Sequence, residues 1–112
     1  MIPTIQRAVQ QDFSAVCALL RKSGLPYDDL TAPAMEHFWI AKAGGMIFGV
    51  IGLEPYGRDG LLRSLAVEKD RQGQGWGSRL VAHLENAAKG DGVQKLYLLT
   101  TTAQDFFAAR HY

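Results

Sequence analysis

Residues 68–78 of this chain read EKDRQGQGWGS, and this stretch decides how the sequence around it folds. It separates a strand-like run, which ends in Leu65-Ala66-Val67, from a helix-like run, which begins near Trp76. Alternate positions within it are glycine: Gly73, Gly75 and Gly77. A glycine-rich turn that opens a helix leaves backbone N–H groups free and directs the positive end of the helix dipole to the same point. The stretch therefore predicts a phosphate-binding loop.

The segments around this loop predict a strand, a helix and a second strand. Over about residues 75–89 the apolar residues share one helical face: Trp76, Leu80, Val81, Leu84, Ala87 and Ala88. Residues 61–67 before the loop are mostly apolar, and residues 93–100 contain the apolar run LYLL at 96–99. Because a helix joins these two strands, we expect them to be parallel.

The chain before residue 61 predicts one helix and three strands. Residues 4–9 form a short strand, and a helix follows from Gln10 with an apolar face. That face comprises Phe13, Val16, Cys17 and Leu20. Residues 25–33 form either a solvated connection or a substrate lid, with a short helical turn at 34–36. Strands 38–43 and 46–55 flank Gly44-Gly45, a hairpin signal, and the second strand is apolar enough to be central.

The complete pattern is β-α-β-β-β-α-β-α, ending with a predicted helix at 103–110. It indicates an α/β protein with a mixed sheet, in which an antiparallel meander joins one parallel βαβ unit. Glycines 49 and 52 indicate a twist, a bulge or the close approach of another backbone. A length of 112 residues predicts one domain, residues 1–112.

Composition excludes several classes of function. The formal net charge of +1 provides no overall basic field for nucleic acid or for an anionic membrane. The single cysteine, Cys17, forms no internal disulfide and no structural metal site by itself. No signal peptide or membrane span is recognisable, so we expect a cytoplasmic protein that uses no metal.

Two nucleotide-binding motifs do not fit the glycine loop. A dinucleotide-binding G-x-G-x-x-G that starts at Gly73 requires glycine at position 78, where Ser78 stands. That motif also follows its strand almost immediately, whereas residues 68–72 intervene here as a polar elbow. A P-loop requires Gly-Lys-Ser or Gly-Lys-Thr, and the chain has neither.

From about residue 61 to residue 112, and more loosely before, the chain resembles the GCN5-related N-acetyltransferase (GNAT) family. The family signature, Gln/Arg-x-x-Gly-x-Gly/Ala, is matched by QGQGWG at 72–77. The elements around the signature follow in the family's order: the strand end, the elbow, the motif, the helix, the next strand, and the helix at 103–110 that carries Phe106-Phe107. The resemblance implies a GNAT-like acyl-CoA N-acyltransferase fold and acetyl-CoA as the co-substrate.

The resemblance also implies where acetyl-CoA binds. Its pyrophosphate would accept hydrogen bonds from the backbone of residues 73–78, and its pantetheine arm would pair with residues 65–67, in a cleft that residues 96–100 close. The cofactor-binding residues expected in this way are Leu65, Ala66, Val67, Gln72, Gly73, Gln74, Gly75, Trp76, Gly77 and Ser78.

By resemblance, the reaction is acetyl transfer to the amine of a small molecule, which requires a base. Glu54 is the first candidate, with a structural surface carboxylate as the alternative, and His37 and His83 are weaker candidates. Arg63, expected on the opposite face of its strand from Ser64, either binds a substrate carboxylate or forms a surface ion pair. The segment 96–107 resembles amino-acid acetyltransferases found with arsenic-resistance genes, which favours an amino-acid-like acceptor.

The chain departs from the family pattern in two places. The tyrosine that usually protonates the departing thiolate is replaced by Phe107. The family's two final strands are also missing after Tyr112, which predicts an open sheet edge at 96–99 and a homodimer formed through it. The alternative function is an acetyl-CoA-binding module or interaction subunit with weak or no turnover.

Overall fold

The computed structural model describes residues 2–93 and 95–98. They form one five-stranded sheet in the order β1-β2-β3-β4-β5. Strands β1 to β4 are antiparallel to their neighbours, and β5 is parallel to β4. The strand bounds are β1 Thr4–Arg7, β2 Phe38–Ala43, β3 Met46–Tyr56, β4 Asp59–Val67 and β5 Lys95–Leu98. The predicted meander, the central third strand and the parallel βαβ unit are confirmed.

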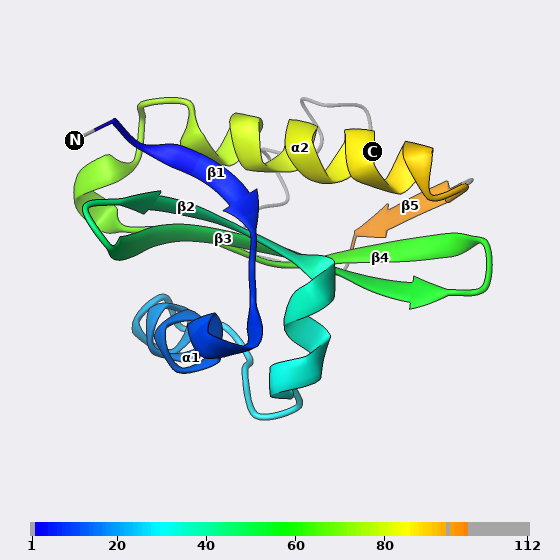
Figure 1. The fold of residues 1–112 in the computed structure, drawn as a ribbon, viewed down its shortest axis with the longest axis horizontal. Helices are drawn as coiled ribbons and strands as arrows, with labels where there is room; N and C mark the ends of the chain where they lie inside the picture. The colour runs from blue at the N-terminus through cyan, green and yellow to red at the C-terminus, as the bar shows by residue number, and fades with distance from the viewer. Residues whose placement is uncertain (1, 94, 99–112) are drawn as a thin grey trace.

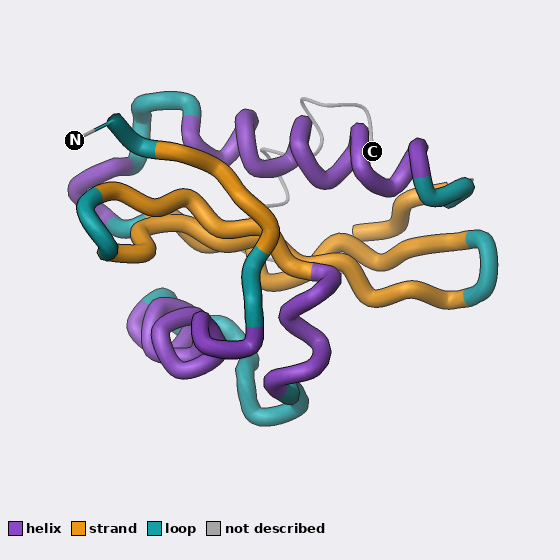
Figure 2. The backbone as a smooth tube through the Cα atoms, in the orientation of Figure 1, coloured by secondary structure: helices purple, strands orange, loops and turns teal. Residues whose placement is uncertain are grey.

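Helices cover both faces of this sheet (Figure 1). Helix α2 (Trp76–Gly90) lies along one face, and helix α1 (Phe13–Lys22) lies on the other, together with the 3₁₀ helix η2 (Ala32–His37). Figure 2 shows the same arrangement, with the strands as a single layer between helical segments. Each face has its own apolar cluster, so the core consists of two thin layers on either side of β2, β3 and β4.

The starts of the helices and most of their buried residues agree with the sequence pattern. The 3₁₀ helix η1 (Gln10–Asp12) leads into α1, and the Asp12 carboxylate accepts a 2.9 Å hydrogen bond from the amide of Val9. On α1, Val16, Leu19 and Leu20 are buried. Phe13 and Cys17, expected on the buried face, are only partly buried. Helix α2 buries Trp76, Leu80, Val81, Leu84 and Ala88.

Two glycines within β3 leave room for side chains of neighbouring elements, and a register shift lies next to Gly52. A Cβ at Gly52 would overlap the ring of Phe38 on β2. A Cβ at Gly49 would lie 3.1 Å from Leu80 of α2. Glycine at these positions therefore leaves room for the Phe38 ring of β2 at Gly52 and for the Leu80 side chain of α2 at Gly49.

A bulge interrupts the pairing of β3 with β4. Gly52 pairs with Arg63 and Val50 with Ala66, so one residue on β3 faces two on β4. Ser64 lies in this bulge with φ of 61°, a left-handed conformation that is uncommon for residues other than glycine. The bulge changes the side-chain alternation, and the Arg63 Nε donates a 3.1 Å hydrogen bond to the Ser64 Oγ. The expectation that these two side chains lie on opposite faces is therefore wrong.

Several other bounds differ slightly from the sequence-based expectation. Strand β1 ends at Arg7 rather than Val9, and β4 begins at Asp59 rather than Leu61. The predicted helix at 103–110, the Phe106-Phe107 pair and Leu99 of the expected open edge lie outside the described residues. Among the residues that are described, no helix is long and apolar enough to cross a membrane.

Candidate functional site

A cleft of about 510 Å³ opens where β4 ends and α2 begins. Its floor is the last part of β4, and the glycine loop forms one wall. Two residues that follow α1 also line the cleft. The lining residues are Ser23, Leu25, Leu65, Ala66, Val67, Arg71, Gln72, Gly73, Gly75, Trp76, Gly77 and Ser78. Of the predicted cofactor-binding residues only Gln74, which is exposed, is absent from this lining.

The glycine loop has a backbone that only glycine adopts readily. Gly73 and Gly75 have φ of 80° and 87°, and Gly75 is the N-cap of α2. No side chain caps the helix at this position. The first N–H groups of a helix have no intrahelical partner, and the helix dipole adds positive potential there. The rim of the cleft therefore offers backbone donors suited to an anion such as phosphate.

The elbow before the loop is held by its own contacts. Gln72 donates a 2.9 Å hydrogen bond from Nε2 to the carbonyl of Val67, which closes the elbow on the end of β4. The amide of Glu68 donates to the carbonyl of Phe48 at 2.7 Å, which ties the start of the elbow to β3. These bonds fix the position of the glycine loop relative to the strand.

Aromatic and cationic side chains pack against one another next to the glycine loop. The rings of Phe48 and Trp76 pack edge to face with centroids 5.0 Å apart. The guanidinium of Arg71 lies 4.4 Å from the Phe48 ring centroid, and that of Arg79 lies 4.8 Å from the Trp76 ring. Trp76 is only 8% exposed, so it forms a rigid wall at the N-terminus of α2.

Three residues that line the cleft were not predicted from the sequence. Ser23 and Leu25 follow α1 and reach the cleft only through tertiary packing, and Arg71 belongs to the polar elbow. A 2.8 Å ion pair between Lys22 and Glu68 joins the end of α1 to the elbow. Contacts between segments this far apart leave no periodic signal in one sequence. The charged residues of the elbow were the only hint for Arg71.

Arg63 is the centre of a second polar group, next to the bulge. Its Nη1 lies 2.7 Å from Glu54 Oε1 and 2.5 Å from Asp29 Oδ2, and its Nη2 donates to Asp29 Oδ1 at 2.9 Å. The pair with Asp29 is thus bidentate. The structure brings together the two residues singled out as candidate base and candidate substrate ligand, and it adds Asp29 from the loop before η2.

Electrostatics in this group favour the charged forms. The hydrogen bond to Arg63 lowers the pKa of Asp29 below its ordinary value. The hydrogen bond to Asp29 raises the pKa of Arg63, and the Glu54 carboxylate adds to this rise. The Arg63 side chain is 14% exposed, whereas that of Asp29 is 56% exposed.

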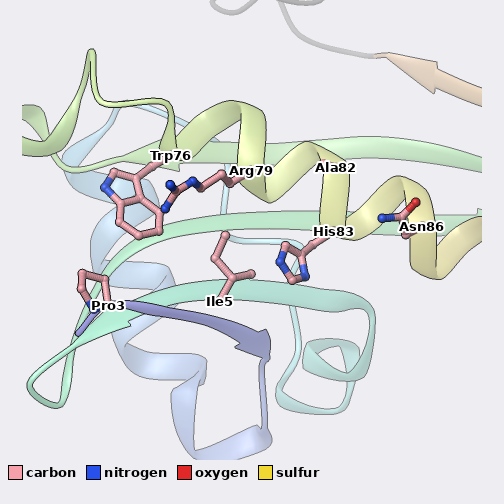
Figure 3. A pocket seen from close by; sticks show the side chains of 7 residues that line it. All are labelled: Pro3, Ile5, Trp76, Arg79, Ala82, His83 and Asn86. Carbon is pink, nitrogen blue, oxygen red and sulfur yellow. The ribbon is translucent and has the colours of Figure 1, made fainter.

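The weaker histidine candidates lie apart from the cleft lining. His37 Nε2 is 3.3 Å from Glu36 Oε1 at the end of η2. His83 tilts against Trp39, with ring centroids 5.8 Å apart, and borders a second cavity between β1 and α2 (Figure 3). That cavity measures about 440 Å³ and shares Trp76 with the cleft. Within residues 2–93 and 95–98, no three His, Cys, Asp or Glu side chains form a possible metal site.

Comparison with known proteins identifies the family of the chain. The family described as Acetyltransferase (GNAT) domain matches residues 34–112, which include the sheet meander, the glycine loop and α2. The chain belongs to the GNAT family. The family resemblance inferred from the loop signature is therefore confirmed, and so is the fold.

Similar proteins include amino-acid acetyltransferases. This GNAT chain is 36% identical over 78 residues to the amino-acid acetyltransferase of Ralstonia nicotianae, covering 68% of this chain and 17% of that protein. The chain thus spans less than a fifth of the length of this relative.

Solved GNAT structures align with nearly the whole chain. N-acetylglutamate synthase from Neisseria gonorrhoeae, complexed with coenzyme A and N-acetyl-glutamate, aligns with a TM-score of 0.85 and 27% identity. The alignment covers 98% of this chain and 28% of that one. Rv2747 from Mycobacterium tuberculosis, in complex with CoA, aligns with a TM-score of 0.78 and 26% identity, covering 96% and 69%.

Proposed function

We propose that this GNAT chain transfers the acetyl group of acetyl-CoA to the amine of a small, amino-acid-like molecule. The observation that carries the proposal is the cleft at the N-terminus of α2, where the glycine loop meets the end of β4. The similar amino-acid acetyltransferases, and the similar structures that contain coenzyme A, support the choice of donor and acceptor.

In this proposal the cleft binds acetyl-CoA through backbone groups. The pyrophosphate accepts hydrogen bonds from N–H groups of residues 73–78, and the pantetheine arm runs along residues 65–67. Among the described residues, β5 pairs with β4 only from Asp59 to Leu62. The part of β4 after the bulge therefore has no described strand neighbour on that side. In the proposal, an extended ligand pairs with this part of the β4 backbone.

The proposed reaction is a direct transfer. The neutral amine attacks the thioester carbonyl carbon, and a backbone N–H near Val67 stabilises the oxyanion that forms. The C–S bond then breaks, the amide remains on the acceptor, and the thiolate of coenzyme A takes up a proton. Glu54 is the proposed base for the amine, acting directly or through water. Arg63 contacts its carboxylate and holds it in a fixed position on the sheet.

Arg63 is the proposed ligand for the carboxylate of the acceptor. Its planar guanidinium binds carboxylates by two parallel hydrogen bonds, and it already does so with Asp29. Because Glu54 contacts the same guanidinium, a carboxylate bound there would place the α-amine of an amino acid near the proposed base.

Two measurements test the proposed function. Calorimetry should show that acetyl-CoA binds, and a thiol-release assay should show turnover with at least one member of a panel of amino acids and amines. Binding without turnover on any acceptor would instead support the acetyl-CoA-binding module, which the phenylalanine at position 107 favours. Absence of binding would exclude both functions.

We also propose a homodimer and a cytoplasmic location. In the described part of the chain, β5 is the last strand of the sheet, and an edge strand presents N–H and C=O groups that a second copy can pair with. The single free cysteine agrees with a reducing compartment. Light scattering coupled to gel filtration tests the dimer, and a monomer at all concentrations would contradict it.

A further inference from the structure

The bidentate site of Arg63 already holds a carboxylate, and this carboxylate comes from the protein itself. Two oxygens of Asp29 accept hydrogen bonds from Nη1 and Nη2, at 2.5 and 2.9 Å. This is the geometry in which arginine binds the carboxylate of a small ligand. An amino acid that binds Arg63 in the same way must first take the place of Asp29.

The two carboxylates around Arg63 are held very differently. Glu54 lies on β3, where it pairs with Leu61, diagonally across the ladder from Arg63 on the same face of the sheet. Its position is therefore fixed by the sheet. Asp29 lies on the connection between α1 and η2, and its side chain is 56% exposed. Of the two partners, Asp29 is the one that can exchange.

The local structure around Asp29 lets its side chain move while the backbone stays in place. The amide of Leu30 donates to the carbonyl of Tyr27 at 3.1 Å, which makes residues 27–30 a tight turn. Leu30 is buried and Tyr27 packs against the same core cluster, so both ends of the turn are anchored. Asp28 and Asp29 form its exposed tip. A change of side-chain rotamer at Asp29 would release both of its contacts with Arg63, while Glu54 stays on Nη1.

The charge balance also favours exchange with a zwitterion. One guanidinium faces two carboxylates, so the group carries a net charge of about −1 when all three are ionised. The Arg63 hydrogen bond that lowers the pKa of Asp29 keeps this carboxylate charged at neutral pH. Displacement of Asp29 leaves the Glu54 carboxylate in place beside the bound ligand, and this carboxylate attracts the ligand's ammonium group.

We propose that Asp29 is an internal carboxylate that occupies Arg63 in the free protein and is displaced by the carboxylate of an amino-acid acceptor. The proposal rests on the proposed function, and it makes Asp29 a residue that sets acceptor specificity. Only acceptors with a carboxylate can compete for the guanidinium. Because only molecules in which Asp29 is displaced can bind the ligand carboxylate, the apparent Kd equals the intrinsic Kd divided by the fraction of such molecules.

The kinetic test uses Asp29→Asn, with Asp28→Asn as a matched control. Both changes remove one negative charge from the same turn, but only Asp29 contacts Arg63. Asp29→Asn should lower KM for amino-acid acceptors roughly two- to fivefold at unchanged kcat, the range expected when one partly exposed ion pair is removed. It should leave KM for the corresponding amino-acid amides unchanged, and Asp28→Asn should change neither. An equal fall of KM for acids and amides, or a rise for the acids, would overturn the proposal.

A binding measurement keeps the test independent of turnover. The Nε–H resonance of Arg63 in a ¹⁵N NMR spectrum, assigned by its loss in Arg63→Lys, is followed while the same amino acids and amides are added without acetyl-CoA. We expect a shift with amino acids only, at lower concentration in Asp29→Asn than in the wild type. If this shift occurs but no acceptor is acetylated, the exchange stands and the proposed function fails. If no amino acid shifts the resonance in either protein, the exchange itself is refuted.

Discussion

Gly75 shows how a single residue connects the fold to the proposed cofactor site. It has φ of 87°, yet a Cβ at this position would meet no heavy atom within 4 Å. We expect Gly75→Ala to cost about 1–2 kcal/mol of unfolding free energy, because an L-residue is strained in the left-handed region. Acetyl-CoA should still bind, since a methyl group fits the open space. Urea unfolding and calorimetry measure the two effects separately.

Gly75→Glu introduces the same strain together with a negative charge where the pyrophosphate is proposed to bind. We expect a similar loss of stability and no measurable binding of acetyl-CoA. The comparison with Gly75→Ala separates charge from strain. Retained affinity in the glutamate variant would show that the phosphate site is elsewhere.

Gly52 has a different constraint, which arises from packing. A methyl group there would overlap the Phe38 ring, and both residues lie in the middle of the sheet. We expect Gly52→Ala to destabilise the protein by about 1–3 kcal/mol through overpacking. Gly90→Ala, at the end of α2 in open space, should change stability by less than about 0.5 kcal/mol. Equal effects in urea unfolding would contradict the close approach of β2 and β3.

A substitution at Arg63 can distinguish the effect of its positive charge from the effect of its hydrogen-bond geometry. Arg63→Lys keeps the positive charge but removes the two parallel hydrogen bonds. We expect kcat/KM to fall roughly tenfold or more for amino-acid acceptors, the loss expected for one charge-assisted hydrogen bond, and much less for their amides. An equal loss on both kinds of acceptor would mean that Arg63 only positions Glu54 and does not contact the substrate.

At the residue scale, the position of the glycine loop could be predicted from the sequence. Backbone conformations and side-chain partners that depend on tertiary contacts could not. The motif predicted a glycine loop at residues 73–77, and the structure adds that Gly73 and Gly75 have positive φ. Ser64 also has a positive φ, but nothing in a serine indicates it; the bulge follows from the register of two strands. The partner of Arg63 was equally hidden, because Asp29 lies 34 residues earlier in the chain.

At the scale of elements, one interaction links the connection after α1 to β4, and it responds to pH. Asp29 has its pKa lowered from 3.8 by Arg63, so its contribution to stability is complete above the unfolded value and is lost as pH falls through the folded value. Wild type should therefore be slightly more stable than Asp29→Asn at pH 7, and the difference should shrink as the pH falls below 3.8 and through the lowered folded pKa of Asp29. The effect is small because solvent screens a carboxylate that is 56% exposed.

Urea unfolding of both proteins between pH 7 and pH 2.5 measures this difference. Asp28→Asn, for which no ion pair with Arg63 exists in the structure, is the control and should show no comparable change. A constant difference at all pH values would mean that the substitution at position 29 alters the turn itself rather than the ion pair.

The elements themselves were the most predictable feature of the chain. The apolar face of α2 and the Gly44-Gly45 hairpin were recognisable because periodicity and turn chemistry are local properties. The buried face of α1 was predicted less accurately, since Leu19 is buried in the core and Cys17 is only partly buried. Its orientation depends on the packing of α1 against β3 and β4, which one helical pattern does not fix.

At the scale of the whole molecule, the cleft joins the two helical layers. Trp76 is the first residue of α2 and the glycine loop leads into it, whereas Ser23 and Leu25 follow α1, which lies on the other face of the sheet. A ligand that fills the cleft therefore contacts both layers and the end of β4 together. Such a ligand binds the folded chain only, because these segments are far apart in the unfolded chain.

Acetyl-CoA should accordingly raise the unfolding temperature of the whole domain. At 100 times its Kd, a ligand specific for the folded state adds about 2.7 kcal/mol, which corresponds to a rise of roughly 10 °C or more for a domain of this size. Gly75→Ala should show nearly the same rise from a lower starting temperature, and Gly75→Glu should show none. Scanning calorimetry with and without acetyl-CoA measures all three. A full rise in Gly75→Glu would place the cofactor outside the cleft, whereas a rise in none of the proteins would refute cofactor binding by this chain.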